Sequence, residues 1–188
     1  LPQWTEDDQR FARATQREVG GSETGLATEL SVLRPALTEA QRTAGFADDI
    51  GDISWNVPTA TLSFPSNIPG LPGHHWANAM AMATPIAHKG ATQGAIAQAM
   101  TLLDFIVQPD LVDMAWDYFE NIQNREIQYT PLIRPSDHPA TEMNAEIMGN
   151  FREEMRKYYY DPDRYDSYLD QLGVSYPTLR QADGRCTI

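Results

Sequence analysis

The chain has 188 residues, of which 41% are hydrophobic and 21% charged, an ordinary globular composition that can bury a core. Its net charge of −12 comes from 26 acidic and 14 basic residues, which argues against nucleic acid or an anionic membrane surface as the main partner. All 26 acids lie outside residues 53–103, a window that holds one base, Lys89, and three of the four histidines. No apolar run approaches the roughly 20 residues that a bilayer span needs.

The N-terminal part of the chain predicts a helix followed by short strands. Thr5 and the three acids after it are typical of a helix start, and Gly20 and Gly21 end that helix. We expect helical turns at 29–33 and 38–43 and an acidic turn at 48–52. Residues 53–57 and 59–64 are expected to be strands, because they are β-branched or alternating and bounded by prolines. Residues 76–82 favour a third strand, although their Met and Ala spacing also fits a helix.

The rest of the chain predicts helices. Thr84 and Pro85 open a helix that runs to Val107, and its two adjacent apolar stripes indicate a largely buried element. Further helices are expected at 109–125, 141–160 and 165–172. Helices combined with two or three short strands indicate the α/β or α+β class. The proline-rich break at 134–139 divides the chain into a main part, 1–135, and a helical C-terminal extension, 136–188.

His88 is the first candidate for chemistry. It lies at the head of the expected 85–107 helix, where the helix dipole disfavours the imidazolium, and no acid is near it in sequence. A neutral imidazole is what a metal ion needs. The alternative is a histidine that only caps the helix through backbone hydrogen bonds.

Three other features could form a site, and each has an alternative without function. His74 and His75 would point to opposite faces of a strand, so one of them at most would share a site with His88. Residues 48–52 carry three acids, of which Asp52 leads into an expected strand, but acidic turns commonly cap backbone amides. The loop at 67–73 includes Gly70 and Gly73, which let a ligand approach the backbone, or it is simply a loop.

Several common catalytic motifs are absent from the sequence. It has no phosphate-binding loop, no GxSxG nucleophile elbow, no HExxH and no CxxC. Its lone cysteine, Cys186, excludes an intrachain disulfide and fits a reducing compartment, so we expect a cytoplasmic protein. Metal sites usually need three or four ligands, and the sequence offers few histidines.

Three segments in this order resemble the zinc amidohydrolases related to aminoacylases and glutamate carboxypeptidases. They are DIGDISW at 49–55, PGHHW at 72–76 and IAHKG at 86–90. Within that family the chain is most similar to a branch of p-aminobenzoyl-glutamate hydrolase subunits, over about residues 1–135. The resemblance implies the C-terminal half of a catalytic α/β domain of a zinc-dependent exopeptidase fold, in a protein that forms homo-oligomers when intact.

The resemblance also implies roles for individual residues. His88 matches the family's C-terminal metal ligand, for one of two zinc ions, with manganese or cobalt as alternatives. His74, with Gly70 and Gly73, is expected near the substrate, and Asp49 and Asp52 are expected to shape its pocket. The family's HxD pair and its glutamate pair with the general base are missing. The Glu153–Glu154 pair lies in the extension and is better explained as a solvated face.

We therefore expect the C-terminal segment of a metal-dependent amidohydrolase that hydrolyses an N-acyl amino acid or peptide-like amide, such as p-aminobenzoyl-glutamate. Alone it should be inactive, because the base and most metal ligands lie outside it. The remainder of the catalytic domain, in the same or a separate chain, is the expected partner. The alternative is a non-catalytic binding or assembly module. The sequence begins with Leu rather than Met, as expected of a processed product or of a piece cut from a longer protein.

Overall fold

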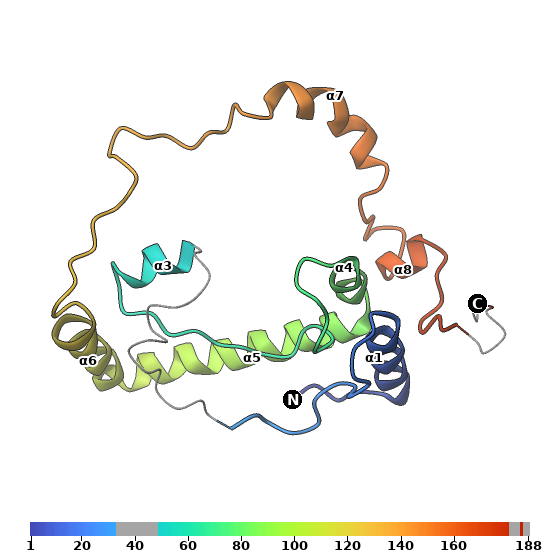
Figure 1. The fold of residues 1–188 in the computed structure, drawn as a ribbon, viewed down its shortest axis with the longest axis horizontal. Coiled ribbons are helices and arrows are strands. Elements are labelled where there is room, and N and C mark those ends of the chain that lie inside the picture. The colour runs from blue at the N-terminus through green and yellow to red at the C-terminus, as the bar shows by residue number, and fades with distance from the viewer. Residues whose placement is uncertain (33–48, 181–184, 186–188) are drawn as a thin grey trace. The chain divides into compact units, whose positions relative to one another are not determined.

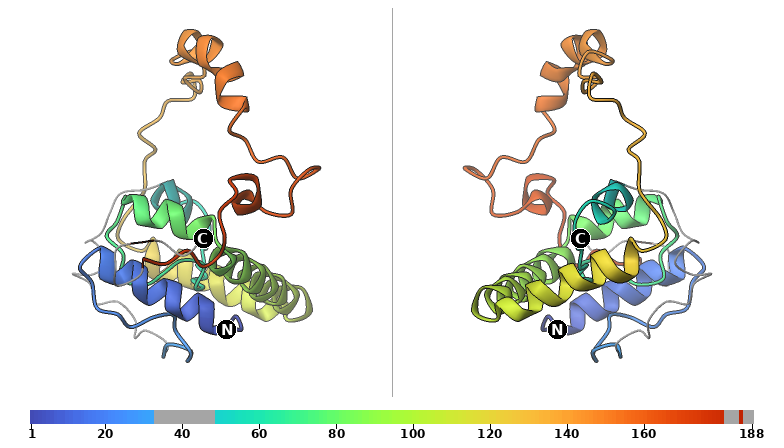
Figure 2. Two further views of the ribbon diagram at one scale, coloured as in Figure 1. Left: turned by 90° about the vertical axis from the view of Figure 1, so that its right-hand side faces the viewer. Right: turned by 90° about the vertical axis from the view of Figure 1, so that its left-hand side faces the viewer.

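The structure is a computed structural model that describes residues 1–32, 49–180 and 185. Helices and irregular segments make up this part of the chain (Figures 1 and 2). In chain order the elements are α1 (Glu6–Glu18), α3 (Asp49–Ser54), α4 (Trp76–Met82), α5 (Pro85–Val107), α6 (Pro109–Tyr118), the π-helical turn η1 (Phe119–Gln123), α7 (Ala145–Arg156) and α8 (Tyr168–Gln171).

The predicted α/β class, and with it half of an α/β catalytic domain, is wrong for this structure, because no strand occurs in the described ranges. Residues 49–54 form α3, whose Asp49 and Asp52 lie in its first turn, where acids interact favourably with the helix dipole. Residues 59–64 are irregular, since short β-branched segments need a paired neighbour to become strands. Residues 76–82 form α4, in agreement with the helical alternative and with the high helix propensity of Ala and Met.

The described chain divides into two compact units. Unit 1 comprises Leu1–Thr28, Phe64–Gln93 and His138–Ile188, and unit 2 comprises Glu29–Ser63 and Gly94–Asp137. The expected division into 1–135 and 136–188 remains a prediction. The expected turn at 38–43, Asp48 and Cys186 lie outside the described residues, and residues 29–32 are not helical.

Helix α1 begins where the sequence predicts. The Thr5 hydroxyl accepts a hydrogen bond from the Asp8 amide (3.1 Å), and the Asp8 carboxylate accepts one from the Thr5 amide (2.8 Å). This reciprocal capping box satisfies two amides that the helix itself leaves unpaired. The helix ends at the glycine pair, and Gly20 has the left-handed φ of +73° that favours glycine.

The core of unit 1 is small and joins distant parts of the chain. It consists of Phe11, Ala12, Leu26, Ile68, Ala81 and Ile86, with Trp4, Leu71, Tyr176 and Leu179 packed against it. Gln16 on α1 holds two loops against this helix. Its side chain is 1% exposed, accepts a hydrogen bond from the Gly25 amide (2.8 Å) and donates one to the Pro69 carbonyl (2.9 Å). Burial of a large side chain such as Phe11 or Ile86 contributes about 1.5–3 kcal/mol.

Helix α5 forms as predicted, but most of its apolar surface is exposed rather than buried. Ile86 is fully buried, whereas Met100, Leu103 and Ile106 are 62%, 58% and 73% exposed. No single described helix is long and apolar enough to cross a membrane; α5 together with α6 and η1 passes that test as a pair bent by 94°. A helix that is apolar on all sides is normally covered in a larger core.

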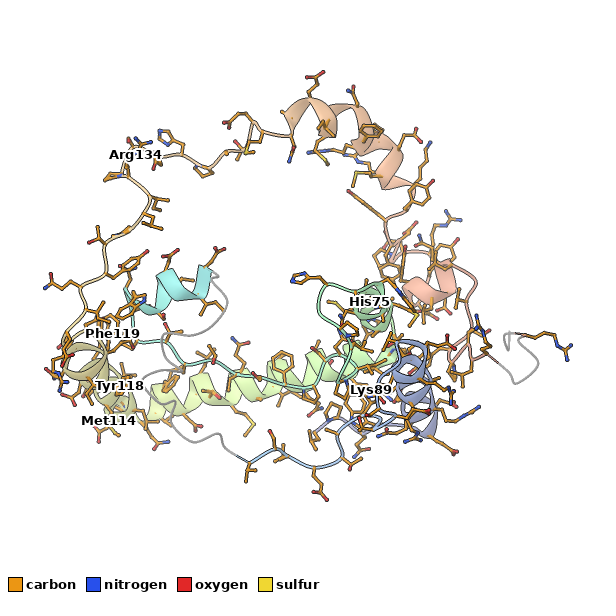
Figure 3. The ribbon with its side chains drawn as sticks, viewed as in Figure 1. His75, Lys89, Met114, Tyr118, Phe119 and Arg134 are labelled. Atoms are coloured by element: carbon orange, nitrogen blue, oxygen red, sulfur yellow. The ribbon has the colours of Figure 1, made fainter. Side chains whose placement is uncertain are left out.

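Unit 2 carries little core of its own. Phe119 is its buried large apolar side chain among the described residues, and Trp116 contacts it edge-on with ring centroids 5.6 Å apart. Figure 3 labels Met114, Tyr118 and Phe119 on α6 and at its end. The expected helix at 109–125 is therefore observed with a π-helical last turn, and those at 141–160 and 165–172 are shorter than expected.

Candidate functional site

The first turn of α5 is the best-fixed part of the candidate site. Ile86 points into the core, and Gly90 lies against the backbone of Pro65 and Ser66, where an added Cβ would be 2.1 Å from the Pro65 carbonyl oxygen. Lys89 donates a hydrogen bond to the Asp8 carboxylate, with an Nζ–Oδ2 distance of 2.5 Å. Figure 3 shows Lys89 on this turn beside α1. His88 is the exposed residue of the turn.

Asp8 is the buried charge beside this turn, with an exposed fraction of 1%. It accepts hydrogen bonds from the Thr5 amide, from Lys89 and from the Tyr176 hydroxyl, whose oxygen lies 2.9 Å from Oδ1. Burial opposes ionisation, but the hydrogen bonds from Lys89, Thr5 and Tyr176 outweigh it and hold the pKa of Asp8 below its ordinary value. Burial and the Asp8 carboxylate together raise the pKa of Tyr176.

The chemistry of His88 fits a single metal ligand. Its ring nitrogens have no hydrogen-bond partner in the described part of the chain, whereas its backbone carbonyl accepts from Thr92 (2.9 Å). An exposed imidazole without a partner can donate a lone pair to a metal ion. However, no group of three or more His, Cys, Asp or Glu side chains among the described residues could hold a metal. A complete metal site would need further ligands.

The loop before α4 contains two residues with a positive φ. Gly70 has φ +75°, and His74 has φ +53°, which is uncommon for a residue with a side chain. A Cβ added at Gly70 or Gly73 would meet nothing within 4 Å, so the loop backbone is open to solvent. His75 caps α4, because its Nδ1 accepts from the Ala77 amide (3.3 Å). Figure 3 labels His75 at the start of this helix. The opposite-face argument for the two histidines therefore does not apply.

The predicted acidic residues belong to unit 2, whereas His74 and His88 belong to unit 1. Both Asp49 and Asp52 are exposed on α3. Asp52 accepts a hydrogen bond from the Tyr129 hydroxyl, which raises the pKa of Tyr129. Gln123 donates to the Ser54 carbonyl (2.7 Å), so the C-terminal half of α3 is tied to the segment that follows α6.

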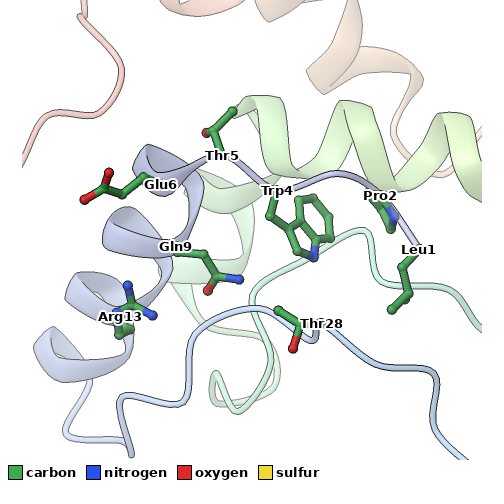
Figure 4. A pocket seen from close by; sticks show the side chains of 8 residues that line it. All are labelled: Leu1, Pro2, Trp4, Thr5, Glu6, Gln9, Arg13 and Thr28. Atoms are coloured by element: carbon green, nitrogen blue, oxygen red, sulfur yellow. The ribbon is translucent and has the colours of Figure 1, made fainter.

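Two open hollows in the described part of the chain are lined by residues other than the predicted site residues. One, of about 440 Å³, lies along the N-terminal segment and α1 and is lined by Leu1, Pro2, Trp4, Thr5, Glu6, Gln9, Arg13 and Thr28 (Figure 4). Another, of about 460 Å³, lies among basic and tyrosine side chains of residues 156–172. Lys157 there is paired with Glu154 (2.6 Å).

Sequence reasoning missed Asp8, Lys89 and Tyr176 as a group. Asp8 is recognisable as the N3 residue of a capping box, which gives it a local role only. Lys89 is the single base of the acid-free window, so its partner had to come from a distant segment. Tyr176 lies 168 positions from Asp8, and no local pattern predicts such a pairing.

Comparison with known proteins finds a short match to a distant relative. The chain is 28% identical over 84 residues to a p-aminobenzoyl-glutamate hydrolase subunit of Escherichia coli (strain K12). The aligned stretch covers 45% of this chain and 18% of that protein, so the match spans less than a fifth of the relative. No family model and no solved structure matches the chain. The similarity supports a hydrolase-related function in the wider amidohydrolase family, and the name of the relative identifies that protein as one subunit of an enzyme.

Proposed function

We propose that this chain is part of a metal-dependent amidohydrolase that cleaves the amide bond of an N-acyl amino acid or small peptide-like substrate, such as p-aminobenzoyl-glutamate. The observation that carries the proposal is the similarity to a subunit of p-aminobenzoyl-glutamate hydrolase. The exposed, unpaired His88 on a firmly held helical turn supports it. The chain alone is inactive in this proposal, because the general base and most metal ligands lie outside it.

His88 supplies one imidazole to a site that holds two divalent ions, zinc in the first place and manganese or cobalt as alternatives. When bound, such ions provide a nucleophilic water and polarise the amide carbonyl. The general base and the other ligands belong to the remainder of the catalytic domain.

The substrate side of the proposal rests on the loop before α4. His74 has an unusual positive φ, and such conformations are often found at functional sites. In this position His74 orients the substrate or polarises its carbonyl. The open backbone at Gly70 and Gly73 allows close approach of the substrate. The expected role of Asp49 and Asp52 in shaping the pocket remains a prediction from the sequence.

The exposed apolar surface of α5 supports a polypeptide partner. An amidohydrolase that places α5 in its interior would cover Met100, Leu103 and Ile106. The remainder of the catalytic domain, in the same or a separate polypeptide, is the proposed partner, in a cytoplasmic homo-oligomer. The second candidate function is a non-catalytic binding or assembly module, for which the exposed apolar surface of α5 would be the binding face.

The test compares this chain with the product of the full reading frame that encodes it. Both proteins are incubated with p-aminobenzoyl-glutamate, with zinc and then with a chelator, and release of p-aminobenzoate is followed. We expect hydrolysis by the complete product, loss of that activity with the chelator, and no activity of the 188-residue chain. No hydrolysis of this or of other N-acyl amino acids by the metal-loaded complete product, either alone or together with the polypeptides that co-purify with it, would favour the non-catalytic alternative.

A further inference from the structure

Three contacts hold the first turn of α5 from different directions. Ile86 is buried in the core, Gly90 touches the Pro65–Ser66 backbone, and Lys89 pairs with Asp8. Successive residues of an α-helix are about 100° apart around its axis. Ile86 and Gly90 therefore share one side, Lys89 flanks it, and His88 points away from it. A rotation of this turn about its axis would change the direction of His88.

We propose that Asp8, Lys89 and Tyr176 are positioning residues that fix the direction of His88, a role that rests on the proposed function of His88. Asp8 is the centre of this group, because Lys89 and Tyr176 both donate to its carboxylate. Of the three contacts on the turn, the ion pair is the one that resists rotation from the flank. It also ties α5 to α1, 81 positions away in sequence.

The burial of Asp8 fixes the geometry of its ion pair with Lys89. A carboxylate that is 1% exposed needs its hydrogen bonds, because an unpaired buried charge is costly. Its oxygens are occupied by the Thr5 amide, Lys89 and Tyr176, so the carboxylate cannot turn without losing a donor. Lys89 is the cation paired with Asp8 in the described structure. The ammonium group of Lys89 is thus held at one place relative to α1.

Tyr176 connects the C-terminal extension to Asp8 and to the core beside it. Its ring packs against Phe11, with centroids 5.2 Å apart, and its hydroxyl donates to Asp8. Leu179 packs against the same core. The segment around Tyr176 therefore covers the side of α1 that carries Asp8 and limits access of water to the ion pair. In this proposal the extension acts on the site through Asp8, without touching His88.

The direction of His88 can be measured in the full chain without its natural ligand. Thr92→His pairs an exposed histidine with His88 at i, i+4, and the pair binds a copper(II) chelate. Arg17→Cys, with Cys186→Ser, carries a nitroxide on the exposed surface of α1. Electron paramagnetic resonance then gives the copper–nitroxide distance distribution. The same chain without Thr92→His gives the background from other histidines.

We expect one narrow distribution in this chain and a shifted or broadened one when Lys89→Met or Asp8→Asn is added. Lys89→Arg should restore the narrow distribution, and the matched control Lys157→Met, at an exposed pair, should leave it unchanged. Circular dichroism confirms that each variant is folded. If Lys89→Met or Asp8→Asn does not fold, Tyr176→Phe decides, because it keeps the ring and removes only one hydrogen bond of Asp8.

The proposal is overturned if Lys89→Met and Asp8→Asn give the same distance distribution as the control. Where these variants do not fold, the same result for Tyr176→Phe overturns it. A merely stabilising ion pair would lower the melting temperature and leave the distribution of the folded chain unchanged. The measurement needs neither hydrolysis nor a natural metal site. A failure of the proposed function would therefore appear in the activity and metal assays while the distance distributions stay as expected.

Discussion

Asp8 combines a local and a long-range role in one side chain. It completes the capping box of α1 with Thr5, and the same carboxylate binds Lys89 and Tyr176. The sequence predicts the first role, because Thr followed three residues later by an acid is a helix-start pattern. It cannot predict the second, because the partners come from segments 81 and 168 positions away. The residues expected in the site, His74 and His88, are located by their motifs, but their chemistry remains a prediction.

Removal of the Lys89 ammonium group should destabilise the chain. Lys89→Met leaves a buried carboxylate without its cation, which costs about 1–3 kcal/mol of unfolding free energy. Lys157→Met should cost less than about 0.5 kcal/mol, because exposed ion pairs contribute little. Urea unfolding of the two variants beside the original chain measures both effects. Equal losses in both variants would contradict the role of the buried pair.

Asp8 should also make the unfolding free energy depend on pH in the acidic range. Its pKa in the folded chain lies below the ordinary value of 3.8, so its contribution is complete above that value and is lost as the pH falls through the folded pKa. Unfolding free energies measured from about pH 5 to about pH 2.5 should therefore fall less steeply in Asp8→Asn than in the original chain. The control Asp7→Asn, at an exposed pair, should keep the original slope. Identical slopes for Asp8→Asn and the original chain would argue against this contribution.

At the scale of elements, the sequence predicts helices well and strands poorly. Caps and apolar periodicity identify α1 and α5, because both signals are local. The segments 53–57 and 59–64 have strand-like composition, but a strand requires a neighbour in space. The predicted burial of α5 is also wrong here, since apolar composition indicates what a helix can pack against and not what is present beside it.

Two helical glycines provide a matched test of packing at the start of α5. Gly90→Ala would place a Cβ 2.1 Å from the Pro65 carbonyl oxygen, so we expect a loss of about 1–3 kcal/mol. Gly149→Ala on α7 meets nothing within 4 Å and should add about 0.5–1 kcal/mol through helix propensity. Thermal unfolding of both variants measures the difference. A Gly90→Ala chain as stable as Gly149→Ala would show that the close approach is absent.

At the scale of the whole molecule, substitutions on the exposed apolar surface of α5 should affect assembly and leave the stability of the folded chain almost unchanged. Met100→Gln and Leu103→Gln should change the unfolding free energy of this chain by less than about 0.5 kcal/mol, because both side chains are largely exposed. Ile86→Ala, in the buried part of the same helix, should cost about 2–5 kcal/mol. In the complete reading-frame product, the two glutamine variants should lower hydrolase activity by disturbing assembly. Full activity and unchanged oligomer size in both would show that this surface stays uncovered.

The central claim is that this chain contributes His88 to a metal site completed by residues outside it. The most direct measurement is the metal-to-protein ratio of the purified reading-frame product, by inductively coupled plasma mass spectrometry, for the original protein, His88→Ala and the exposed control His138→Ala. We predict a lower ratio in His88→Ala and an unchanged one in His138→Ala. The same ratio in all three proteins would contradict the claim.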